Sequence, residues 1–421
     1  MTVTVAPGRL SGSVRAPGSK SHTIRALVVA TLAEGESVIH APLWSGDTTS
    51  CIEACRLLGA RIDADGRERL VVRGTGGSPQ VPDDVIDVGN SGTTLYFLTA
   101  ACGLVRDGYS VLTGDRQIRN RPIDRLIGGL TDLGAAAWTT RGGPSCPVIV
   151  QGPLSGGETS IECPTSQYLS ALLLALPLAP AASVIRVPLL NERPYVEMTL
   201  RWLDEQAMEY ERDGYSEFRV AGNQRYRAFE RAIPGDYSSA TFLFCAAALS
   251  RSTITVTGLD PGDSQGDRAV LSILADMGCT VEESESSVTI SGRRLRGGSF
   301  DLNAIPDALP ALAATACFAE EEVLLVNVPQ ARLKETDRIA VMAEELERLG
   351  ARIEETADGM IIRPSRLRGG RVSSHADHRV AMALAIAGLG ADGQVKIDGG
   401  EAASITFPRF YDTLSQLGAT F

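Results

Sequence analysis

One arrangement of hydrophobic and polar positions recurs along the chain. It is an amphipathic helix that ends in Leu or Met, then Gly, then Ala or Cys, and is followed by a strand, a turn and a second strand. The glycine predicts a left-handed residue that ends the helix. A degenerate copy has Gln206-Ala207 at this step, and copies recur about every 70 residues, so the pattern predicts six related units. The glycines are Gly59, Gly134, Gly278, Gly350 and Gly418.

This repeat is too long for a solenoid of small units, and each copy has room for two helices and several strands. Three copies make about 200 residues, which is an ordinary domain size. We therefore predict an α/β protein with two domains of three repeats each and a crossover near residues 232–236. One domain is expected at residues 16–234 and the other at residues 1–15 plus 235–421.

Four further segments are apolar on nearly every side. Helices of this kind are buried, because no face suits water. We therefore expect helices at the centre of each domain and sheets outside them. The four segments are residues 170–181, 239–249, 308–319 and 380–390.

Composition narrows the possible partners. The net charge of −11 argues against non-specific binding to nucleic acid. No apolar run reaches the length of about 18 residues needed to span a membrane, and the N-terminus lacks the pattern of a signal peptide. The eight cysteines form no CxxC pair and several lie in apolar segments, which predicts a reducing, cytoplasmic location without disulfides. The four histidines do not cluster with them, so we expect no metal.

Polar residues gather at the predicted starts of helices in the N-terminal half. Lys20 and Ser21 open one helix after Gly18-Ser19, and Gly92 lies in a glycine-rich turn before another. Backbone N–H groups, hydroxyls and a lysine at such positions suit a phosphate or carboxylate. Residues 112–126 add four arginines, including Arg121, whose guanidinium can bind such groups bidentately. Ordinary helix caps and a basic surface loop would explain the same residues without a ligand.

The same pattern recurs at the buried helices. Thr165, Ser166 and Gln167 precede one of them, and their hydrogen-bonding groups suit a hydroxylated ligand. Asp307 starts another, and residues 377–379 (Asp-His-Arg) start the last of the four. A purely structural explanation is that each acid is an N-cap and that Asp377 pairs with Arg379.

Residues 332–341 carry the densest charge cluster. They follow the apolar run 323–326 and lead into an amphipathic helix, which Thr336 or Asp337 can cap. A solvated helix start is the simplest explanation. If the buried helices run in parallel, however, their positive ends meet in one cleft between the domains, and Asp307 and Glu335 become an acid/base pair. Such a cationic cleft calls for a polyanionic small ligand. Its cations would be Lys20, Arg25, Arg121, Lys334, Arg338 and Arg379.

Several motifs in order resemble the family of 5-enolpyruvylshikimate 3-phosphate (EPSP) synthases, which are enolpyruvyl transferases. They are PGSKSHTIRAL, GNSGTT, TSQYLSALL, RPYVEMTL, LKETDRI, DHRVAMALA and TFPRF, and they span essentially the whole chain. The resemblance implies an inside-out α/β barrel of six βαβαββ-type repeats. It also implies transfer of enolpyruvyl from phosphoenolpyruvate to the 5-hydroxyl of shikimate 3-phosphate, by addition and elimination through a tetrahedral intermediate. Phosphate leaves, no cofactor takes part, and we expect a monomer.

The resemblance also assigns roles to matching residues. Glu335 would protonate the methylene carbon of the donor, Asp307 would take the proton of the acceptor hydroxyl, and Lys20 would assist catalysis. Phosphoenolpyruvate would be bound by Lys20, Gly92, Arg121, Gln167, Arg338 and Arg379. The acceptor would be bound by Lys20, Ser21, Arg25, Thr165, Ser166, Gln167, Tyr195, Asp307, Gln330 and Lys334.

Four positions depart from the family pattern. Tyr96 stands where Arg is common, and Gln330 stands where Asn is common. Ile405 replaces a lysine that contacts the phosphate of phosphoenolpyruvate. Glu192 replaces a serine that contacts the acceptor phosphate, which a carboxylate would repel. These departures keep open a related carboxyvinyltransferase with a different hydroxylated acid as acceptor.

Two further functions have less support in the sequence. The branch of the family that acts on UDP-N-acetylglucosamine commonly has a reactive cysteine in the loop before the RP motif. This chain has no cysteine between Cys102 and Cys146. A non-catalytic anion-binding protein would have no need of both Asp307 and Glu335.

Overall fold

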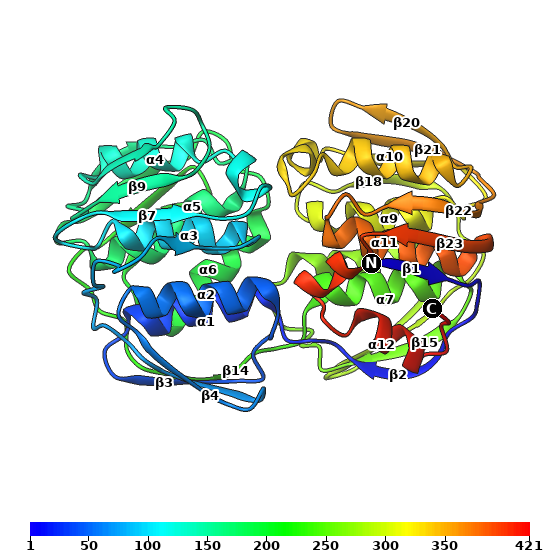
Figure 1. Cartoon of the computed structure of the whole chain (residues 1–421), viewed down its shortest axis with the longest axis horizontal. Coiled ribbons are helices and arrows are strands. Elements are labelled where there is room, and N and C mark those ends of the chain that lie inside the picture. The colour runs from blue at the N-terminus through cyan, green and yellow to red at the C-terminus, as the bar shows by residue number, and fades with distance from the viewer. The chain divides into compact units, whose positions relative to one another are not determined.

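Two compact units make up the computed structural model, which describes all residues 1–421 (Figure 1). One unit consists of Met1–Ser19 and Pro234–Phe421, and the other of Lys20–Ile233. The chain passes between them twice, after Ser19 and after Ile233. Neither unit has a helix with the length and apolar character needed to cross a membrane.

The unit Lys20–Ile233 has three four-stranded sheets. In each, an edge strand pairs in parallel with the next strand, which pairs antiparallel with one strand of a hairpin. Their strand orders are β14(Glu230–Ala232)-β3(Glu36–His40)-β5(Arg69–Arg73)-β4(Arg61–Asp65), β6(Ile86–Asp87)-β7(Ser110–Thr113)-β9(Val148–Gln151)-β8(Ala136–Thr139) and β10(Gly157–Ser160)-β11(Ser183–Arg186)-β13(Glu217–Val220)-β12(Tyr210–Asp213).

The other unit repeats this topology in three sheets. The last sheet has only three strands, and β1 from the N-terminus pairs antiparallel with β23, so the start of the chain completes the final repeat. The orders are β16(Thr280–Glu283)-β17(Ser287–Ser291)-β15(Thr253–Thr257)-β2(Ser11–Arg15), β18(Gly298–Asp301)-β19(Val323–Val326)-β21(Gly359–Arg363)-β20(Arg352–Thr356) and β1(Thr2–Val5)-β23(Asp392–Asp398)-β22(Arg368–Ser373). The predicted six-fold α/β repeat is confirmed.

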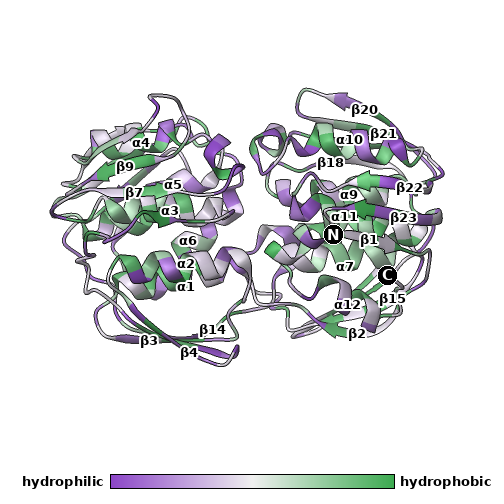
Figure 2. Cartoon of the chain, viewed as in Figure 1, coloured by the Kyte–Doolittle hydropathy of each residue, from purple (hydrophilic) through white to green (hydrophobic).

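Buried helices form the centre of each unit, as predicted. Every residue of α3, α7 and α9 is buried, and hydrophobic residues run along α7 and α9 in Figure 2. In one unit α3 packs against α5, and in the other α11 packs against α7 and α9. The helices are α1(Lys20–Leu32), α2(Gly46–Leu57), α3(Gly92–Cys102), α4(Asp124–Asp132), α5(Ser166–Ala175), α6(Arg193–Glu205), α7(Tyr237–Leu249), α8(Val270–Asp276), α9(Leu309–Ala316), α10(Arg338–Arg348), α11(His378–Gly390) and α12(Phe410–Gln416).

The repeated glycines end their helices in the left-handed conformation, as the sequence predicts. In the degenerate copy the same backbone geometry falls on Ala207, with φ +54°. Side chains rarely adopt this conformation, which explains why glycine is used at the other five copies. Their φ angles are +99° at Gly59, +97° at Gly134, +103° at Gly278, +98° at Gly350 and +106° at Gly418.

One buried helix differs from its predicted bounds. The apolar segment 170–181 predicts a single helix, but α5 starts at Ser166, ends at Ala175 and continues as the 3-10 turn Leu176–Leu178. Pro177 has no N–H to continue the helical hydrogen bonds, so the regular helix stops before it.

Candidate active site

A buried arginine organises the charged residues at the start of α10. Arg338 is the first residue of this helix, and Asp337 caps it by accepting a hydrogen bond from the backbone N–H of Ala340 at 3.1 Å. The Arg338 side chain is 1% exposed and donates to carboxylates from three segments. Its Nε lies 2.9 Å from Asp377, its Nη1 lies 2.8 Å from Asp307, and its Nη2 lies 2.5 Å from Glu335.

Two more cations lie beside Asp307. Arg379 Nη2 lies 3.0 Å from Asp307 Oδ2, and Lys334 Nζ lies 3.9 Å from Oδ1. We call Asp307, Lys334, Glu335, Arg338, Asp377 and Arg379 the charged cluster. It combines three cations with three carboxylates, so its charges balance without a ligand.

The opposite charges of the charged cluster shift the pKa values of its members. Burial alone would raise the pKa of Asp307, but the surrounding cations, Arg379 foremost, outweigh burial and hold that pKa well below its usual range. Burial likewise opposes the charge of Arg338, yet its three carboxylates, Asp377 foremost, raise its pKa. Asp307 and Arg338 are therefore both charged in the free protein. As long as these cations face Asp307, its carboxylate is a weak base.

Asp377 has a structural role that the sequence only partly indicated. It caps α11 as expected, accepting from the backbone N–H of Arg379 at 2.8 Å. Its ion pair, however, is with Arg338 rather than with Arg379, and Thr336 Oγ1 also donates to it at 3.0 Å. Asp377 thus ties the start of α10 to the start of α11.

Gln330 is buried in the turn that leads to the charged cluster. Its Nε2 donates to the backbone oxygen of Asn303 at 2.9 Å, and its Oε1 has no hydrogen-bond partner. A buried amide oxygen without a partner is costly, so it can accept a hydrogen bond from a ligand at little cost.

In the unit Lys20–Ile233, the predicted residues lie in four groups. At the start of α1, Lys20 Nζ lies 3.0 Å from Oδ2 of Asp47, whose side chain is 3% exposed. Asp47 was not among the residues predicted from the sequence. The signal was present, because Ser45 forms a capping box with Thr48 and Asp47 stands in the first turn of α2. This is the same pattern of polar residues at a helix start.

Arg25 forms the second group with α6. Its guanidinium donates to Thr199 Oγ1 at 2.9 Å and to the backbone oxygens of Tyr195 and Ser21 at 2.9 and 3.1 Å. It also lies 5.1 Å from the ring centre of Phe97. Burial lowers the pKa of Arg25 to about 9, because all of these acceptors are neutral and no carboxylate pairs with it. A buried cation of this kind favours an anionic ligand.

Gly92 and Arg121 form the third group and lie in direct contact. A Cβ atom on Gly92 would lie 2.2 Å from Arg121 Nη1, so any side chain at this position would push the guanidinium aside. Two tyrosines, Tyr96 and Tyr168, donate to the backbone oxygen of Pro122, which follows Arg121, at 3.1 and 2.7 Å. The departure at Tyr96 therefore replaces a cation by a buried hydrogen bond that fixes the backbone next to Arg121.

The fourth group lies at the start of α5. Thr165 is its N-cap, and Gln167 follows with a buried Oε1 that has no hydrogen-bond partner. Glu192, the cap residue of α6, turns inward with its side chain buried. Its Oε2 accepts from Thr165 Oγ1 at 3.1 Å, from Ser166 N at 3.1 Å and from Ser166 Oγ at 2.8 Å.

Ile405 ends the 3-10 turn Gly400–Ile405 and is partly buried. Its side chain packs against the hydrophobic core of its own unit. The position that carries a lysine in the family pattern is thus apolar here.

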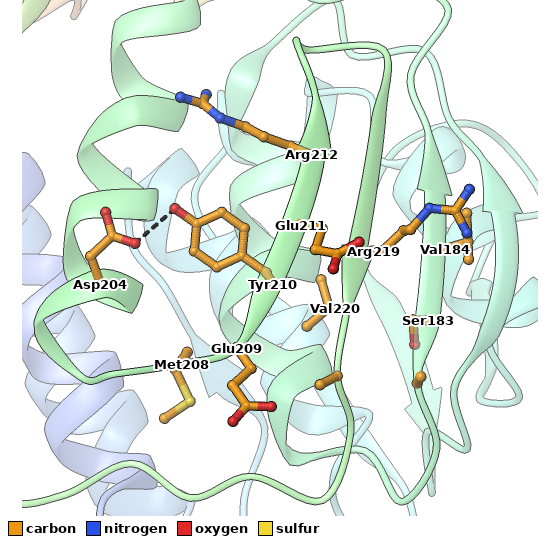
Figure 3. A pocket seen from close by; sticks show the side chains of 12 residues that line it. Ser183, Val184, Asp204, Met208, Glu209, Tyr210, Glu211, Arg212, Arg219 and Val220 are labelled. Atoms are coloured by element: carbon orange, nitrogen blue, oxygen red, sulfur yellow. Dashed lines mark hydrogen bonds between the residues drawn. The ribbon is translucent and has the colours of Figure 1, made fainter.

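The candidate residues do not line the cavity in Figure 3. A cavity of about 790 Å³ lies beside the sheet β10-β11-β13-β12 and is lined by its strands and by the end of α6, where Tyr210 donates to Asp204 (Figure 3). It contains no residue of the charged cluster and none of the four groups. Its walls mix carboxylates, arginines and apolar side chains without a convergent set of polar groups, so we assign it no role.

Comparison with known proteins places this fold among enolpyruvyl transferases. The structure resembles EPSP synthase from Acinetobacter baumannii with a TM-score of 0.83, 27% sequence identity and coverage of 100% of both chains. The enolpyruvyl transferase NikO from Streptomyces tendae has the same fold, with a TM-score of 0.80 at 20% identity over 99% of this chain and 97% of that one.

Sequence comparison identifies the family. Residues 5–414 match the family model described as EPSP synthase (3-phosphoshikimate 1-carboxyvinyltransferase). A relative of that name from Acetivibrio thermocellus is 53% identical over 100% of this chain and 99% of its own length. Another, from Ruminiclostridium cellulolyticum, is 50% identical over 99% of each chain. The chain belongs to the EPSP synthase family and is a transferase, as the sequence motifs predicted.

Proposed function

We propose that this protein transfers the enolpyruvyl group of phosphoenolpyruvate to the 5-hydroxyl of shikimate 3-phosphate and releases phosphate, a step toward chorismate and the aromatic amino acids. The observation that carries the proposal is the charged cluster, in which Asp307 and Glu335 share the cation Arg338. The family match from residue 5 to residue 414 gives this cluster its chemical context.

The donor carries a phosphate and a carboxylate, both of which need cations. We assign them to Lys20 and Arg121 of one unit and to Arg338 and Arg379 of the other. Arg121 is supported by its contact with Gly92, where a Cβ atom would lie 2.2 Å from Arg121 Nη1. Because Ile405 stands in place of a cation, binding of the donor phosphate depends more strongly on the remaining cations.

Replacing Gly92 by alanine should weaken donor binding. The new methyl group would overlap Arg121 Nη1 and force the guanidinium aside. A displacement of about 1 Å can cost up to ~100-fold, so we expect the KM for phosphoenolpyruvate to rise about 10- to 100-fold. Steady-state kinetics with each substrate varied in turn would measure this. A KM for the acceptor that rose as much as that for the donor would contradict the assigned role.

The acceptor carboxylate is assigned to Ser21 and Arg25. The support is electrostatic, because Arg25 is buried among neutral acceptors. A carboxylate ligand would supply the missing negative charge. Thr165, Ser166, Gln167 and Tyr195 would bind the rest of the acceptor, together with Gln330 and Lys334 of the other unit.

Proton transfer is assigned to Asp307 and Glu335, two of the three carboxylates that pair with Arg338. Asp307 takes the proton of the acceptor hydroxyl as its oxygen bonds to C2 of phosphoenolpyruvate, and Glu335, which takes up a proton when the anionic donor binds, gives that proton to C3. In the second step Glu335 takes a proton back from the new methyl group while the C2–O bond to phosphate breaks. The proton held by Asp307 leaves with the phosphate, so both carboxylates return to their starting state.

Donor binding would also activate Asp307. In the free protein the cations of the charged cluster hold its pKa low, which makes it a poor base. The anionic donor competes with Asp307 for those cations. The pKa of Asp307 therefore rises when phosphoenolpyruvate binds, and its carboxylate becomes basic only when the reactant is present.

Phosphate release from purified protein tests the proposal. We expect release that requires both phosphoenolpyruvate and shikimate 3-phosphate. Reactions with UDP-N-acetylglucosamine as acceptor should release none. The proposed function would be rejected if saturating shikimate 3-phosphate gave no phosphate above the donor-only control. The eight unpaired, buried cysteines suit a reducing cytoplasm, and we further infer that the protein acts there as a monomer.

A further inference from the structure

Two anion positions lie along the first turn of α6. One is at Arg25, which is held by the backbone oxygen of Tyr195 and has no carboxylate partner. The other is at the start of α5, where Thr165 Oγ1, Ser166 Oγ and Ser166 N–H converge. Three donors at the positive end of a helix suit a phosphate, whereas a guanidinium matches a carboxylate. An acceptor with one phosphate and one carboxylate would use both.

The two positions differ in how the protein itself fills them. The position at Arg25 has no negative charge from the chain. The position at α5 is taken by Glu192, whose buried carboxylate accepts all three hydrogen bonds through one oxygen. The backbone of Glu192 is left-handed, with φ +58° and ψ +39°, a conformation that residues other than glycine seldom adopt.

We propose that Glu192 is the residue that sets selectivity for the acceptor's phosphate, because its carboxylate occupies the position that this phosphate takes and has to be displaced by it. The proposal rests on the proposed function for the identity of the acceptor. It deepens that function by naming the residue that the acceptor's phosphate must displace.

The physical reason is charge repulsion combined with competition for the same donors. A phosphate and a carboxylate cannot both accept from Ser166 at the same place, and like charges side by side destabilise a complex. Moving Glu192 outward costs its three hydrogen bonds, which the phosphate then replaces. An acceptor that lacks the phosphate does not displace Glu192, so its binding costs none of these hydrogen bonds. The phosphate should therefore add less to the binding free energy of the acceptor in this protein than in a variant without this carboxylate.

Calorimetry with two acceptors tests the proposal. Shikimate 3-phosphate and unphosphorylated shikimate are titrated separately into the full-length protein, Glu192→Ser and Glu192→Gln. Serine leaves the donors open, and glutamine keeps the size of the side chain without its charge. Because close like charges cost several kcal/mol, we expect each variant to bind shikimate 3-phosphate at least about tenfold more tightly than the unmodified protein does. Affinity for shikimate should stay within about twofold.

Glu205→Ser is the matched control. Glu205 lies at the other end of α6, is 44% exposed and pairs only with Arg231, so neither affinity should change. The proposal is overturned if the ratio of the two affinities is the same in Glu192→Ser, Glu192→Gln and the unmodified protein, which is what a merely structural cap would give. Binding is measured without phosphoenolpyruvate. Failure of the proposed function would instead appear as bound shikimate 3-phosphate that is not turned over.

Discussion

Replacing Glu335 by glutamine should lower kcat by about 10²- to 10⁴-fold, the usual contribution of general acid–base catalysis. Glutamine has nearly the same shape, and its carbonyl oxygen can still accept from Arg338 Nη2, which lies 2.5 Å from Glu335. It cannot give a proton to C3 of phosphoenolpyruvate or take one back. We therefore expect the KM of both substrates to stay within a few-fold of the original values.

Glu347→Gln provides the control for this loss. Glu347 is an exposed residue of the same helix, α10, so its replacement should leave kcat unchanged. Steady-state phosphate release measures both variants. If Glu335→Gln kept kcat within about threefold of the original value, Glu335 could not carry the proton.

Replacing Asp377 by alanine should destabilise the unit that contains the charged cluster by about 3 to 5 kcal/mol, the usual cost of removing one partner of a buried ion pair. The change removes the bonds to Arg338 Nε and Nη2 at 2.9 and 3.2 Å. It also removes the cap of α11. Arg338 keeps Asp307 and Glu335, so the unit should still fold.

The two units can be followed separately during urea unfolding. All three tryptophans, Trp44, Trp138 and Trp202, lie in the unit Lys20–Ile233, so fluorescence reports on that unit alone. Far-UV circular dichroism reports on both. For Asp377→Ala we expect an earlier transition by circular dichroism and an unchanged fluorescence midpoint. Asp412→Ala, at a side chain 71% exposed, should match the unmodified protein. Superimposable circular dichroism curves for Asp377→Ala would contradict the structural role.

The fold could be predicted because its signals are local and repeated. A left-handed residue after an amphipathic helix needs glycine, and this requirement left Gly59, Gly134 and Gly278 at regular spacing. Even the copy without glycine kept the backbone geometry, at Ala207. The completion of the last sheet by β1 was not predictable, because strand pairing between distant residues leaves no periodic pattern in the sequence.

The candidate site could be predicted only in part. Polar residues at helix starts indicated where charges gather, which identified Asp307, Glu335 and Arg338. They did not indicate which charges pair. The Arg338–Asp377 pair joins residues 39 positions apart, and the Lys20–Asp47 pair joins residues 27 apart, so neither follows from helical spacing. The contact of Glu192 with Thr165 and Ser166 was equally hidden, because it depends on a left-handed backbone at a residue that rarely adopts one.

Isotope incorporation tests whether the enolpyruvyl group is transferred through protonation of the donor at C3. The reaction of phosphoenolpyruvate with shikimate 3-phosphate is run in D₂O, and the product is examined by NMR and mass spectrometry. Glu335 would deliver a deuteron to C3 and then remove either isotope from the rotating methyl group. We predict released phosphate and deuterium in the vinyl group of the product. A product without deuterium at that carbon, or no product at all, would contradict the account.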